Sequence, residues 1–395
     1  MTAKSTNTNR IVSIDVFRGL TILLMIFVND VAGVLEIPLW LKHAAPGSPG
    51  MTLVDVVFPA FLFIVGLAIP FAIARREAQF PEKSVLLHIV IRTAGLLAIG
   101  LLMLNGPAVT SMNKAWWNVL MYTGAILFWS APPRTKKYIS LHRILKGLGF
   151  VLLLILLIIF RREAGDTTSW IRTGWWGILG EIGFAYLIAS LLWLYLRKKP
   201  YLLFFAPVVL LLLYIADRSG QLDFLGKIKD IFYIGSHLGI HPLIAVCGLI
   251  CGRWIFENQE PSKLMKHMGI FAVILTLSGY LLYGLYGIDK VAATPSWALY
   301  SSAICVLLFM LIYWIMDVKN KASAYGFFKP VAANPLLAYL LHVQFIYFFQ
   351  IIGIAGFYGS EPGAGIIGIL RAIVYTGFIY ILTRLLSRAG IRLKL

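Results

Sequence analysis

The sequence predicts an all-α membrane protein, a polytopic bundle of helices. Of its 395 residues, 59% are hydrophobic and 13% are charged, and the mean hydropathy is +0.83. A soluble domain carries about a quarter of charged residues. Apolar runs recur along the chain at the length that a helix needs to cross a bilayer core of ~30 Å. An ordinary soluble domain is therefore excluded.

Hydropathy predicts about twelve spans in one membrane domain over residues 1–395. A cleavable signal peptide is not expected, because the first apolar run carries Asp15 and Arg18. The predicted spans lie near 11–34, 52–74, 85–104, 116–131, 142–160, 175–196, 201–216, 237–256, 268–286, 297–316, 332–352 and 364–385.

The distribution of Lys and Arg predicts the orientation of the bundle. Most of the 35 basic residues fall in segments that are cytoplasmic if the N-terminus is cytoplasmic. Because basic residues favour the cytoplasmic side, we expect both termini inside and the loop that carries His43 outside. The net charge of +18 reflects this bias and attraction to anionic membrane lipids, and it does not indicate a nucleic-acid partner.

Polar residues gather at membrane depth in residues 10–73. They are Asp15, Arg18, Asn29, Asp30 and Asp55. Such groups are costly in lipid unless they face a protein interior or a water-filled cavity. The cluster therefore indicates a functional site, although anchoring of helix ends would use the same residue types.

The second span contains two prolines, Pro59 and Pro70. Proline has no N–H, so neither can bond the carbonyl four residues earlier, at Asp55 and Gly66. We expect a bent helix with unpaired carbonyl oxygens beside Asp55, at the wall of a cavity.

His237 and His241 are four residues apart and could supply two zinc ligands. No third ligand is evident nearby in the sequence, and Ser236 is suited to cap a helix. No metal is therefore expected. The three cysteines, Cys247, Cys251 and Cys305, lie within apolar runs, so we expect packed or lipid-facing thiols and no disulfide.

A late span is predicted to begin with Asn334 as N-cap and Pro335 at its first helical position. His342 lies about 12 Å deeper, near the bilayer midplane. A midplane histidine indicates a functional site or a pairing with a neighbouring helix. The free amides at the start of this helix are a candidate phosphate seat at the cytoplasmic mouth.

The preceding span is predicted to start from the outer side at Thr294 and Pro295. Asp289 and Lys290 come directly before it. We therefore expect polar groups at the outer mouth of the bundle.

Several of these stretches also carry a resemblance. They are SIDVFRGLTILLMIFVND, WLKHA, GMTLVDVVFPAFLFIVGLAI, IDKVAATPSWALYSS and NPLLAYLLH. Together they resemble the bacterial branch of the transmembrane acetyltransferase superfamily, which includes heparan-α-glucosaminide N-acetyltransferase. The resemblance extends over most of the chain.

The resemblance implies an N-acetyltransferase of the bacterial inner membrane, with a homodimer as its assembly. Acetyl-CoA would enter from the cytoplasm, and its acetyl group would reach the amino group of a glucosamine-type sugar on the other side. The matching motifs imply catalytic roles for His43 and Asn29. We expect substrate or donor binding by His342, Asn334, Asp15, Arg18, Asp55, Asp289, Lys290 and Ser296.

The chemistry of these residue types agrees with that assignment. An amine must lose a proton before it attacks a thioester, and an imidazole, with an ordinary pKa of ~6.5, is suited to remove it. His43 could instead carry the acetyl group covalently, and the sequence does not separate the two routes. Asn29 would donate a hydrogen bond to the oxyanion or orient the imidazole. His342 would contact the pantetheine arm or the thioester. We expect Asn29, His43 and His342 to share one cavity.

The chain departs from the family pattern in three places. Residues 174–181, GWWGILGE, replace an R-I-P-G-V-L-Q-R-like block, so Glu181 is expected to be neutral or paired within its span. Residues 236–241, SHLGIH, replace an acidic D-P-E-G-like motif, so the acceptor can differ. The helix pair at about 116–160 is extra to the family core.

Two other functions fit the same observations. One is a secondary transporter of an amino sugar, but the second half of the chain holds no convincing repeat of the D-x-F-R-G block. The other is an acyltransferase that acts on an envelope glycan or a lipid through the same histidine.

Overall fold

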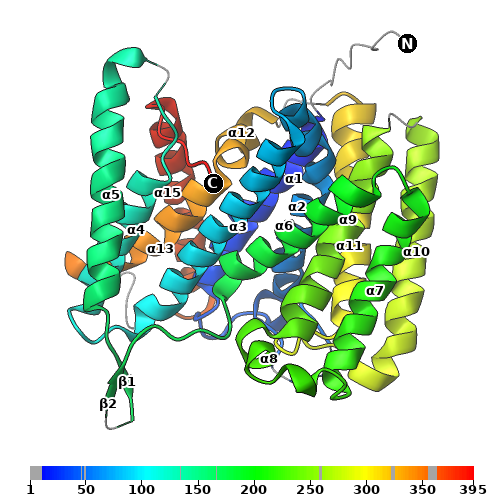
Figure 1. The fold of residues 1–395 in the computed structure, drawn as a ribbon, viewed down its shortest axis with the longest axis horizontal. Helices are drawn as coiled ribbons and strands as arrows, with labels where there is room; N and C mark the ends of the chain where they lie inside the picture. The colour runs from blue at the N-terminus through cyan, green and yellow to red at the C-terminus, as the bar shows by residue number, and fades with distance from the viewer. Residues whose placement is uncertain are drawn as a thin grey trace.

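The protein is an almost entirely helical bundle (Figure 1). The computed structural model describes residues 11–45, 47–48, 50–133, 135–165, 167–257, 260–321, 325–354 and 363–395. Its only strands in this part of the chain, β1 (Arg162–Ala164) and β2 (Thr167–Ser169), pair antiparallel in a short hairpin.

Each predicted span corresponds to a helix. The long helices are α1 (Val12–Val31), α2 (Leu53–Glu77), α3 (Glu82–Asn105), α4 (Lys114–Phe128), α5 (Ile139–Ile159), α6 (Gly177–Leu196), α7 (Pro200–Arg218), α9 (His241–Phe256), α10 (Pro261–Tyr286), α11 (Pro295–Tyr313), α13 (Pro335–Ile351) and α15 (Gly365–Arg388). Shorter pieces are α8 (Lys227–Phe232), the π-helix η5 (Ile234–Ile240) before α9, the π-helix η6 (Trp314–Val318) after α11, and α12 (Tyr325–Ala333).

The number of membrane spans is lower than expected. Among the described residues, 10 helices are long and apolar enough to cross a membrane, or 11 if α12 and α13, bent by 76°, count as one broken span. Two helices account for the difference from about twelve: α4 has 15 residues, which reach about 22 Å at ~1.5 Å per residue, and α13 has 17, which reach about 26 Å. α4 is too short to cross a ~30 Å core unaided.

Hydrogen bonds between distant segments divide the helix connections into two faces. On one face, Gly47 N donates to Asp289 Oδ2 at 2.8 Å, so the His43 loop lies beside the α10–α11 connection. On the other face, Val12 N and Ser13 N both donate to Asp317 at 3.0 Å, so α1 begins where α11 and η6 end. The β1–β2 hairpin and α8 lie at the first face, and α12 lies at the second (Figure 1).

The segments predicted to be cytoplasmic all lie at the second face. Arg197 bonds Glu77 at 2.5 Å there, and Ala131 N donates to Arg392 O at 2.7 Å. Residues 1–10 and Arg134, which were counted with these segments, lie outside the described residues. Which face is cytoplasmic stays a prediction from the charge distribution.

The centre of the bundle is the contact between α2 and α9. Small residues let the two backbones meet: Gly248 and Gly252 of α9 face the carbonyls of Phe63 and Leu67, and Gly66 of α2 faces that of Ala245. Close approach through glycine is typical of helix pairs in membranes. Helices α5, α7, α10 and α15 form the periphery and expose most of their apolar side chains (Figure 1).

Three further expectations can be compared with the structure. The three cysteines are buried, free thiols, as expected for packed side chains. α2 runs as one helix through Pro59 and Pro70. The sequence also spaces apolar residues helically over 222–233, which predicts a helix lying in the membrane interface; this segment forms a turn at Asp223–Leu225 followed by the six-residue α8, with Phe224 and Ile228 exposed.

Candidate functional site

His43 and Asp55 form the centre of the candidate site. His43 follows a short helical turn at Leu39–Leu41, and Asp55 lies in the first turn of α2. The His43 Nδ1 atom lies 2.8 Å from Asp55 Oδ1. The imidazole is 39% exposed, whereas the carboxylate is 2% exposed. The buried acid thus holds one edge of a ring whose other edge can meet a substrate.

The Asp55 carboxylate is itself held by the loop that carries His43. Its Oδ2 atom accepts hydrogen bonds from Ala44 N at 3.1 Å and from Thr52 N at 3.0 Å. The Thr52 hydroxyl also bonds Lys42 O at 2.7 Å. These contacts fix the loop against the start of α2, so the imidazole is held in one position relative to the helix.

The connection between α10 and α11 supplies a cation. Lys290 Nζ lies 3.2 Å from His43 Nδ1 and 3.9 Å from Asp55 Oδ1. Burial lowers the pKa of the Lys290 ammonium, and the Asp55 carboxylate opposes this effect only in part. Because the Lys290 amine carries N–H groups in either protonation state, it places a hydrogen-bond donor beside the ring.

Asp289 positions this connection. Burial raises the pKa of the Asp289 carboxyl, but hydrogen bonds from the backbone N–H groups of Ala292, Gly47 and Val291 outweigh burial and hold the pKa below its ordinary value. Asp289 thus joins its own turn to the His43 loop as a carboxylate.

The tautomer of His43 follows from these distances. His43 Nδ1 has two polar neighbours, Asp55 Oδ1 at 2.8 Å and Lys290 Nζ at 3.2 Å, and it can donate to the first or accept from the second but not both. The shorter contact is to the carboxylate, which accepts, so we assign the proton to Nδ1, and Lys290 then makes no hydrogen bond to that atom. In a neutral ring the Nε2 atom then carries the free lone pair. This is the arrangement of an imidazole that acts as base or nucleophile with a carboxylate as its orienting partner.

Trp297 closes the inner side of the site. Pro59 cannot donate to the Asp55 carbonyl, and the indole N–H of the fully buried Trp297 donates to it instead, at 3.2 Å. The carbonyl that was expected to be unpaired therefore anchors α2 to α11. Ser296, next to Trp297, is fully buried, and its hydroxyl has no hydrogen-bond partner in the described residues.

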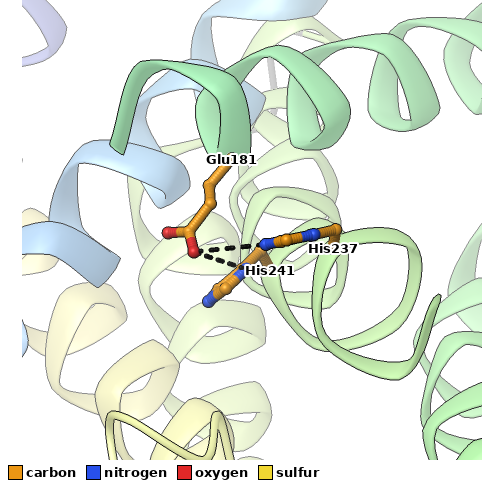
Figure 2. Close-up of side chains that lie close together, drawn as sticks. All are labelled: Glu181, His237 and His241. Carbon is orange, nitrogen blue, oxygen red and sulfur yellow. Dashed lines mark ion pairs between the residues drawn. The ribbon is translucent and has the colours of Figure 1, made fainter. Parts of the chain in front are cut away.

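A second cluster of polar side chains lies next to Trp297. Glu181 of α6, His237 of η5 and His241 at the start of α9 point toward one another (Figure 2). Glu181 Oε1 lies 3.5 Å from His237 Nε2 and 3.9 Å from His241 Nδ1. The expectation that Glu181 is neutral or paired is met by these two imidazoles.

Rings connect this cluster to the His43 site. The His241 ring packs on Phe58 and on Trp297, with centroids 5.6 and 6.1 Å apart. Phe58 belongs to the same helix as Asp55, and Trp297 bonds the Asp55 carbonyl. Two aromatic side chains thus separate the two polar groups.

Asn29 lies near the end of α1 with an exposed side chain. No hydrogen bond joins it to His43 in the part of the chain that the structure describes. Its neighbour Asp30 faces Arg371 of α15, with 3.8 Å between Oδ2 and Nη2. The catalytic role of Asn29 therefore stays a prediction.

His342 is buried in α13, as expected for a midplane residue. Its ring lies 5.5 Å from that of Tyr375 of α15, and the Tyr375 hydroxyl bonds the His342 carbonyl oxygen. Its Nδ1 has no hydrogen-bond partner among the described residues. No contact in that part of the chain links His342 to His43, so the shared cavity stays a prediction.

Asn334 is the N-cap residue of α13 and Pro335 its first residue, as predicted. The Asn334 side chain does not bond the helix, however. Its Nδ2 donates to Ile391 O at 3.0 Å, and its Oδ1 accepts from Leu393 N at 3.1 Å. Asn334 thus ties the C-terminal segment to the break between α12 and α13.

Asp15 and Arg18 pair within α1, with 3.3 Å between Oδ1 and Nη1. Both lie toward the second face, near the end at which Asp317 receives the first amides of α1. Asp15 and Arg18 therefore lie toward the opposite end of the bundle from His43.

Two cavities open at opposite faces. The first, of about 520 Å³, reaches the α10–α11 connection just after Lys290 and is lined by Tyr214, Asp217, Arg218, Lys229, Asp230, Tyr233, Ser236, Val291 and Ala292. The second, of about 360 Å³, lies where α2 ends and α3 begins and is lined by Ala72, Ile73, Arg75, Arg76, Gln79, Phe80, Val85, His88, Ile89, Arg92, Tyr186 and Lys394.

The second cavity is basic. Arg92 lies over the Tyr186 ring at 4.5 Å, and Arg76 lies over the Phe80 ring at 5.0 Å. The Nε atoms of both guanidinium groups are buried without a hydrogen-bond partner among the described residues. Buried donors of this kind suit an anion.

Sequence reasoning missed part of this arrangement. It named His43, Asp55, Asp289 and Lys290 among the site residues but did not predict their mutual contacts, and it did not associate Glu181 with the two histidines. The phosphate seat at the α13 amides stays a prediction, and sequence reasoning did not single out the buried arginines that line the cavity at α2 and α3. Arg75, Arg76 and Arg92 could have indicated this basic cavity from the sequence, but the charge analysis used them only to predict the orientation of the bundle in the membrane.

Comparison with known proteins gives a distant relationship. Heparan-alpha-glucosaminide N-acetyltransferase from Mus musculus is 25% identical, over 86% of this chain and 54% of the mouse protein. The protein of that name from Homo sapiens is 36% identical over 24% of this chain and 14% of its own length. The chain spans about half the length of the mouse relative.

These matches confirm the resemblance at the level of a distant relation to a membrane N-acetyltransferase. The mouse match covers 86% of this chain. A family model described as "Domain of unknown function (DUF5009)" matches residues 10–224, more than half of the chain. The chain therefore belongs to the DUF5009 family.

Proposed function

We propose that this protein is a membrane N-acetyltransferase that moves an acetyl group from acetyl-CoA to the amino group of a glucosamine-type sugar. The observation that carries the proposal is the His43–Asp55 pair, with 2.8 Å between the ring and a buried carboxylate. It leaves Nε2 free on the partly exposed edge of the ring. The distant relation to an N-acetyltransferase supports the reaction class.

In direct transfer, His43 Nε2 accepts a proton from the sugar amine as the nitrogen attacks the thioester carbonyl carbon. The carbon–sulfur bond then breaks, and the thiolate of CoA leaves and takes up a proton. In the alternative route, Nε2 attacks the thioester first, and the acetyl group then passes from the ring to the amine. Both routes pass through an oxyanion.

Lys290 and Asn29 are the proposed donors to that oxyanion. Lys290 Nζ lies 3.2 Å from Nδ1, on the edge of the ring that Asp55 holds, so its flexible side chain must move to bring its N–H groups to an acyl oxygen at Nε2. Asn29 takes this role by its resemblance to the family motif. Asp289 holds the Lys290 connection against the His43 loop through Gly47.

The acceptor sugar is proposed to bind in the cavity of about 520 Å³ beside Lys290. Its lining combines the rings of Tyr214 and Tyr233 with Asp217 and Arg218, so it offers apolar faces and polar groups to a sugar. A volume of this size suits a small polar ligand. Ser236, from the motif that departs from the family pattern, also lines it.

The phosphate groups of acetyl-CoA are proposed to bind in the basic cavity at the opposite face. Arg75 lies twenty residues beyond Asp55 on α2, or about 30 Å at ~1.5 Å per residue. The acetyl group must therefore cross most of the bundle. His342, Asn334, Asp15, Arg18 and Ser296 are the proposed binding residues along this route.

The orientation completes the proposal. With the basic face in the cytoplasm, the donor binds inside and the sugar is acetylated outside, as expected for a bacterial inner-membrane enzyme. A homodimer is the assembly that the resemblance implies.

The test is acetyl transfer by the purified protein in detergent. Labelled acetyl-CoA and glucosamine are supplied to the wild type, to His43→Ala and to a control, His267→Ala, whose ring packs on Trp254. We expect transfer by the wild type and the control and loss in His43→Ala. Transfer that is unchanged in a folded His43→Ala protein would overturn the role of His43.

The same preparation separates the remaining alternatives. Label that stays on acid-quenched protein and is lost in His43→Ala indicates the covalent route, and its absence during turnover indicates direct transfer. Sugar uptake into vesicles without acetyl-CoA, in place of transfer, would favour the transporter. Transfer to a membrane lipid or glycan, but not to free glucosamine, would replace the proposed acceptor.

A further inference from the structure

The Glu181–His237–His241 cluster is a group of three buried side chains, from α6, from η5 and from the start of α9 (Figure 2). Their ligand-type atoms all lie within 4.8 Å of one another. Glu181 is 7% exposed, His237 2% and His241 4%, so bulk water does not solvate the carboxylate. A buried carboxylate needs a cation or a proton as its partner.

The protonation state of His237 follows from its second nitrogen. Its Nδ1 lies 2.8 Å from the Phe232 carbonyl oxygen, which accepts only, so Nδ1 carries a proton. In the neutral ring the Nε2 lone pair is then directed at Glu181 Oε1, 3.5 Å away. Two acceptors face each other, and a positive centre between them would satisfy both.

His241 contributes a second nitrogen to the same oxygen. Its Nδ1 lies 3.9 Å from Glu181 Oε1 and has no hydrogen-bond partner in the described part of the chain. This nitrogen is buried, and its lone pair has no protein donor to receive. The cluster thus holds two imidazole nitrogens aimed at one carboxylate oxygen.

The spacing agrees with a tetrahedral metal site. With metal–ligand bonds of ~2.0–2.1 Å, neighbouring ligand atoms lie about 3.3 Å apart. The two nitrogen–oxygen separations, 3.5 and 3.9 Å, need a small contraction to reach this value. The two imidazole nitrogens lie within 4.8 Å of each other, so the histidine side chains must also close on the ion by a small rotation. Two imidazoles and one carboxylate suit zinc and leave a fourth position for water.

Hydrogen bonds with neighbouring groups hold the side chains of this cluster in place. The Phe232 carbonyl orients His237, and the indole N–H of Trp175 donates to Glu181 Oε1 at 2.6 Å. Metal-binding histidines and carboxylates are typically oriented by such outer hydrogen bonds. His237 also lies in the π-helix η5, a geometry that occurs frequently at functional sites.

We propose that Glu181, His237 and His241 bind one divalent transition-metal ion, with zinc preferred. The ion links α6 to η5 and α9 behind the wall formed by Phe58 and Trp297. It is separate from the His43–Asp55 pair, and the proposal stands independently of acetyl transfer.

The first test is the metal content of the purified protein. The chain is purified by an affinity tag without histidines and without chelator, and its metals are measured by mass spectrometry. We expect about one zinc per chain in the wild type and in His267→Ala, and loss of most of it in His241→Ala. Wild-type protein that holds no metal, and takes up none after addition of zinc or cobalt, would overturn the proposal.

A second variant guards against misfolding. Glu181→Gln keeps the size of the side chain and an acceptor for Trp175, but it removes the negative charge. We expect a chelator to lower the thermal midpoint of the wild type, zinc to restore it, and neither to move the midpoint of Glu181→Gln. An equal response in both proteins would overturn the assignment of the ligands.

Cobalt gives a readout that does not depend on activity or stability. Loaded in place of zinc, it should give the visible absorption of a tetrahedral ion in the wild type and not in His237→Ala. Wild-type protein that binds cobalt without this absorption would contradict the tetrahedral site, and absorption that persists in the variant would contradict the role of His237.

Discussion

Replacing Asp55 by asparagine removes the charge behind His43 with little change in shape. The asparagine amide can turn its oxygen toward the amides of Ala44 and Thr52, which now bond Asp55 Oδ2. Its NH₂ group then faces His43 Nδ1, at the position of the present 2.8 Å contact. Because an NH₂ group donates only, the ring must accept at Nδ1 and carry its proton on Nε2.

The expected magnitude follows from this change of tautomer. With a proton on Nε2, the imidazole can neither accept a proton nor attack a thioester from its exposed edge. The equivalent carboxylate-to-amide change in a Ser-His-Asp triad lowers kcat by about 10⁴. The imidazole of His43 is 39% exposed, so water lets the ring recover the productive tautomer, and we expect a loss of about 10²–10⁴.

The stability cost should be small by comparison. A hydrogen bond to a charged group contributes roughly 1.5–3 kcal/mol and a neutral one roughly 0.5–1.5 kcal/mol, so the variant should lose about 1–2 kcal/mol. Thermal unfolding of the purified protein measures this loss. The fold should therefore survive in Asp55→Asn while the rate falls.

The assay is kcat for acetyl transfer from labelled acetyl-CoA, beside a matched control. Glu257→Gln makes the same change in an acid that pairs with Arg253 at 2.6 Å and lines neither cavity. In a His43→Ala background, Asp55→Asn should lower the rate no further, because its effect passes through the ring. An Asp55→Asn protein that keeps more than about a tenth of kcat would refute the orienting role.

Two further predictions concern the packing and the charge of the site. A methyl group at Gly248 would overlap the Phe63 carbonyl, so Gly248→Ala should lower the free energy of unfolding by about 1–3 kcal/mol. Gly284 has open space around it, so Gly284→Ala should cause no such loss. Thermal unfolding compares the two variants, and equal midpoints would contradict the tight α2–α9 contact. The Asp289 carboxyl, whose pKa is held below its ordinary ~3.9, contributes stability above that pH and loses it as pH falls through the folded value. The difference in thermal midpoint between wild type and Asp289→Asn should therefore shrink below about pH 4, and a difference that persists there would contradict the assignment.

The sequence by itself determined the number and place of the helices well. An apolar run of about twenty residues has one stable form in lipid, because a helix satisfies every backbone group internally. Every predicted span accordingly corresponds to a helix, and the bounds agree to within about four residues except that α10 begins seven residues earlier, at Pro261. The number of spans is lower because α4 and α13 have only 15 and 17 residues.

The sequence also determined which residues of the candidate site lie at one end of the bundle. His43, Asp55, Asp289 and Lys290 all flank helix ends that hydropathy assigns to the same face. Their mutual contacts follow once the two connections meet, as the Gly47–Asp289 bond shows. Span order therefore placed these residues at one end, whereas the role of His43 came from its resemblance to a family motif.

Only the tertiary structure decided the contacts between helices. Glu181 meets His237 and His241 because α6 and η5 turn those side chains toward each other, and Trp297 meets the Asp55 carbonyl because α11 packs on α2. In water, the apolar stripe of a helix indicates which side is buried. In a membrane, lipid is as apolar as the core, so hydropathy gives a helix its depth but not its rotation. That rotation decides which polar side chains meet.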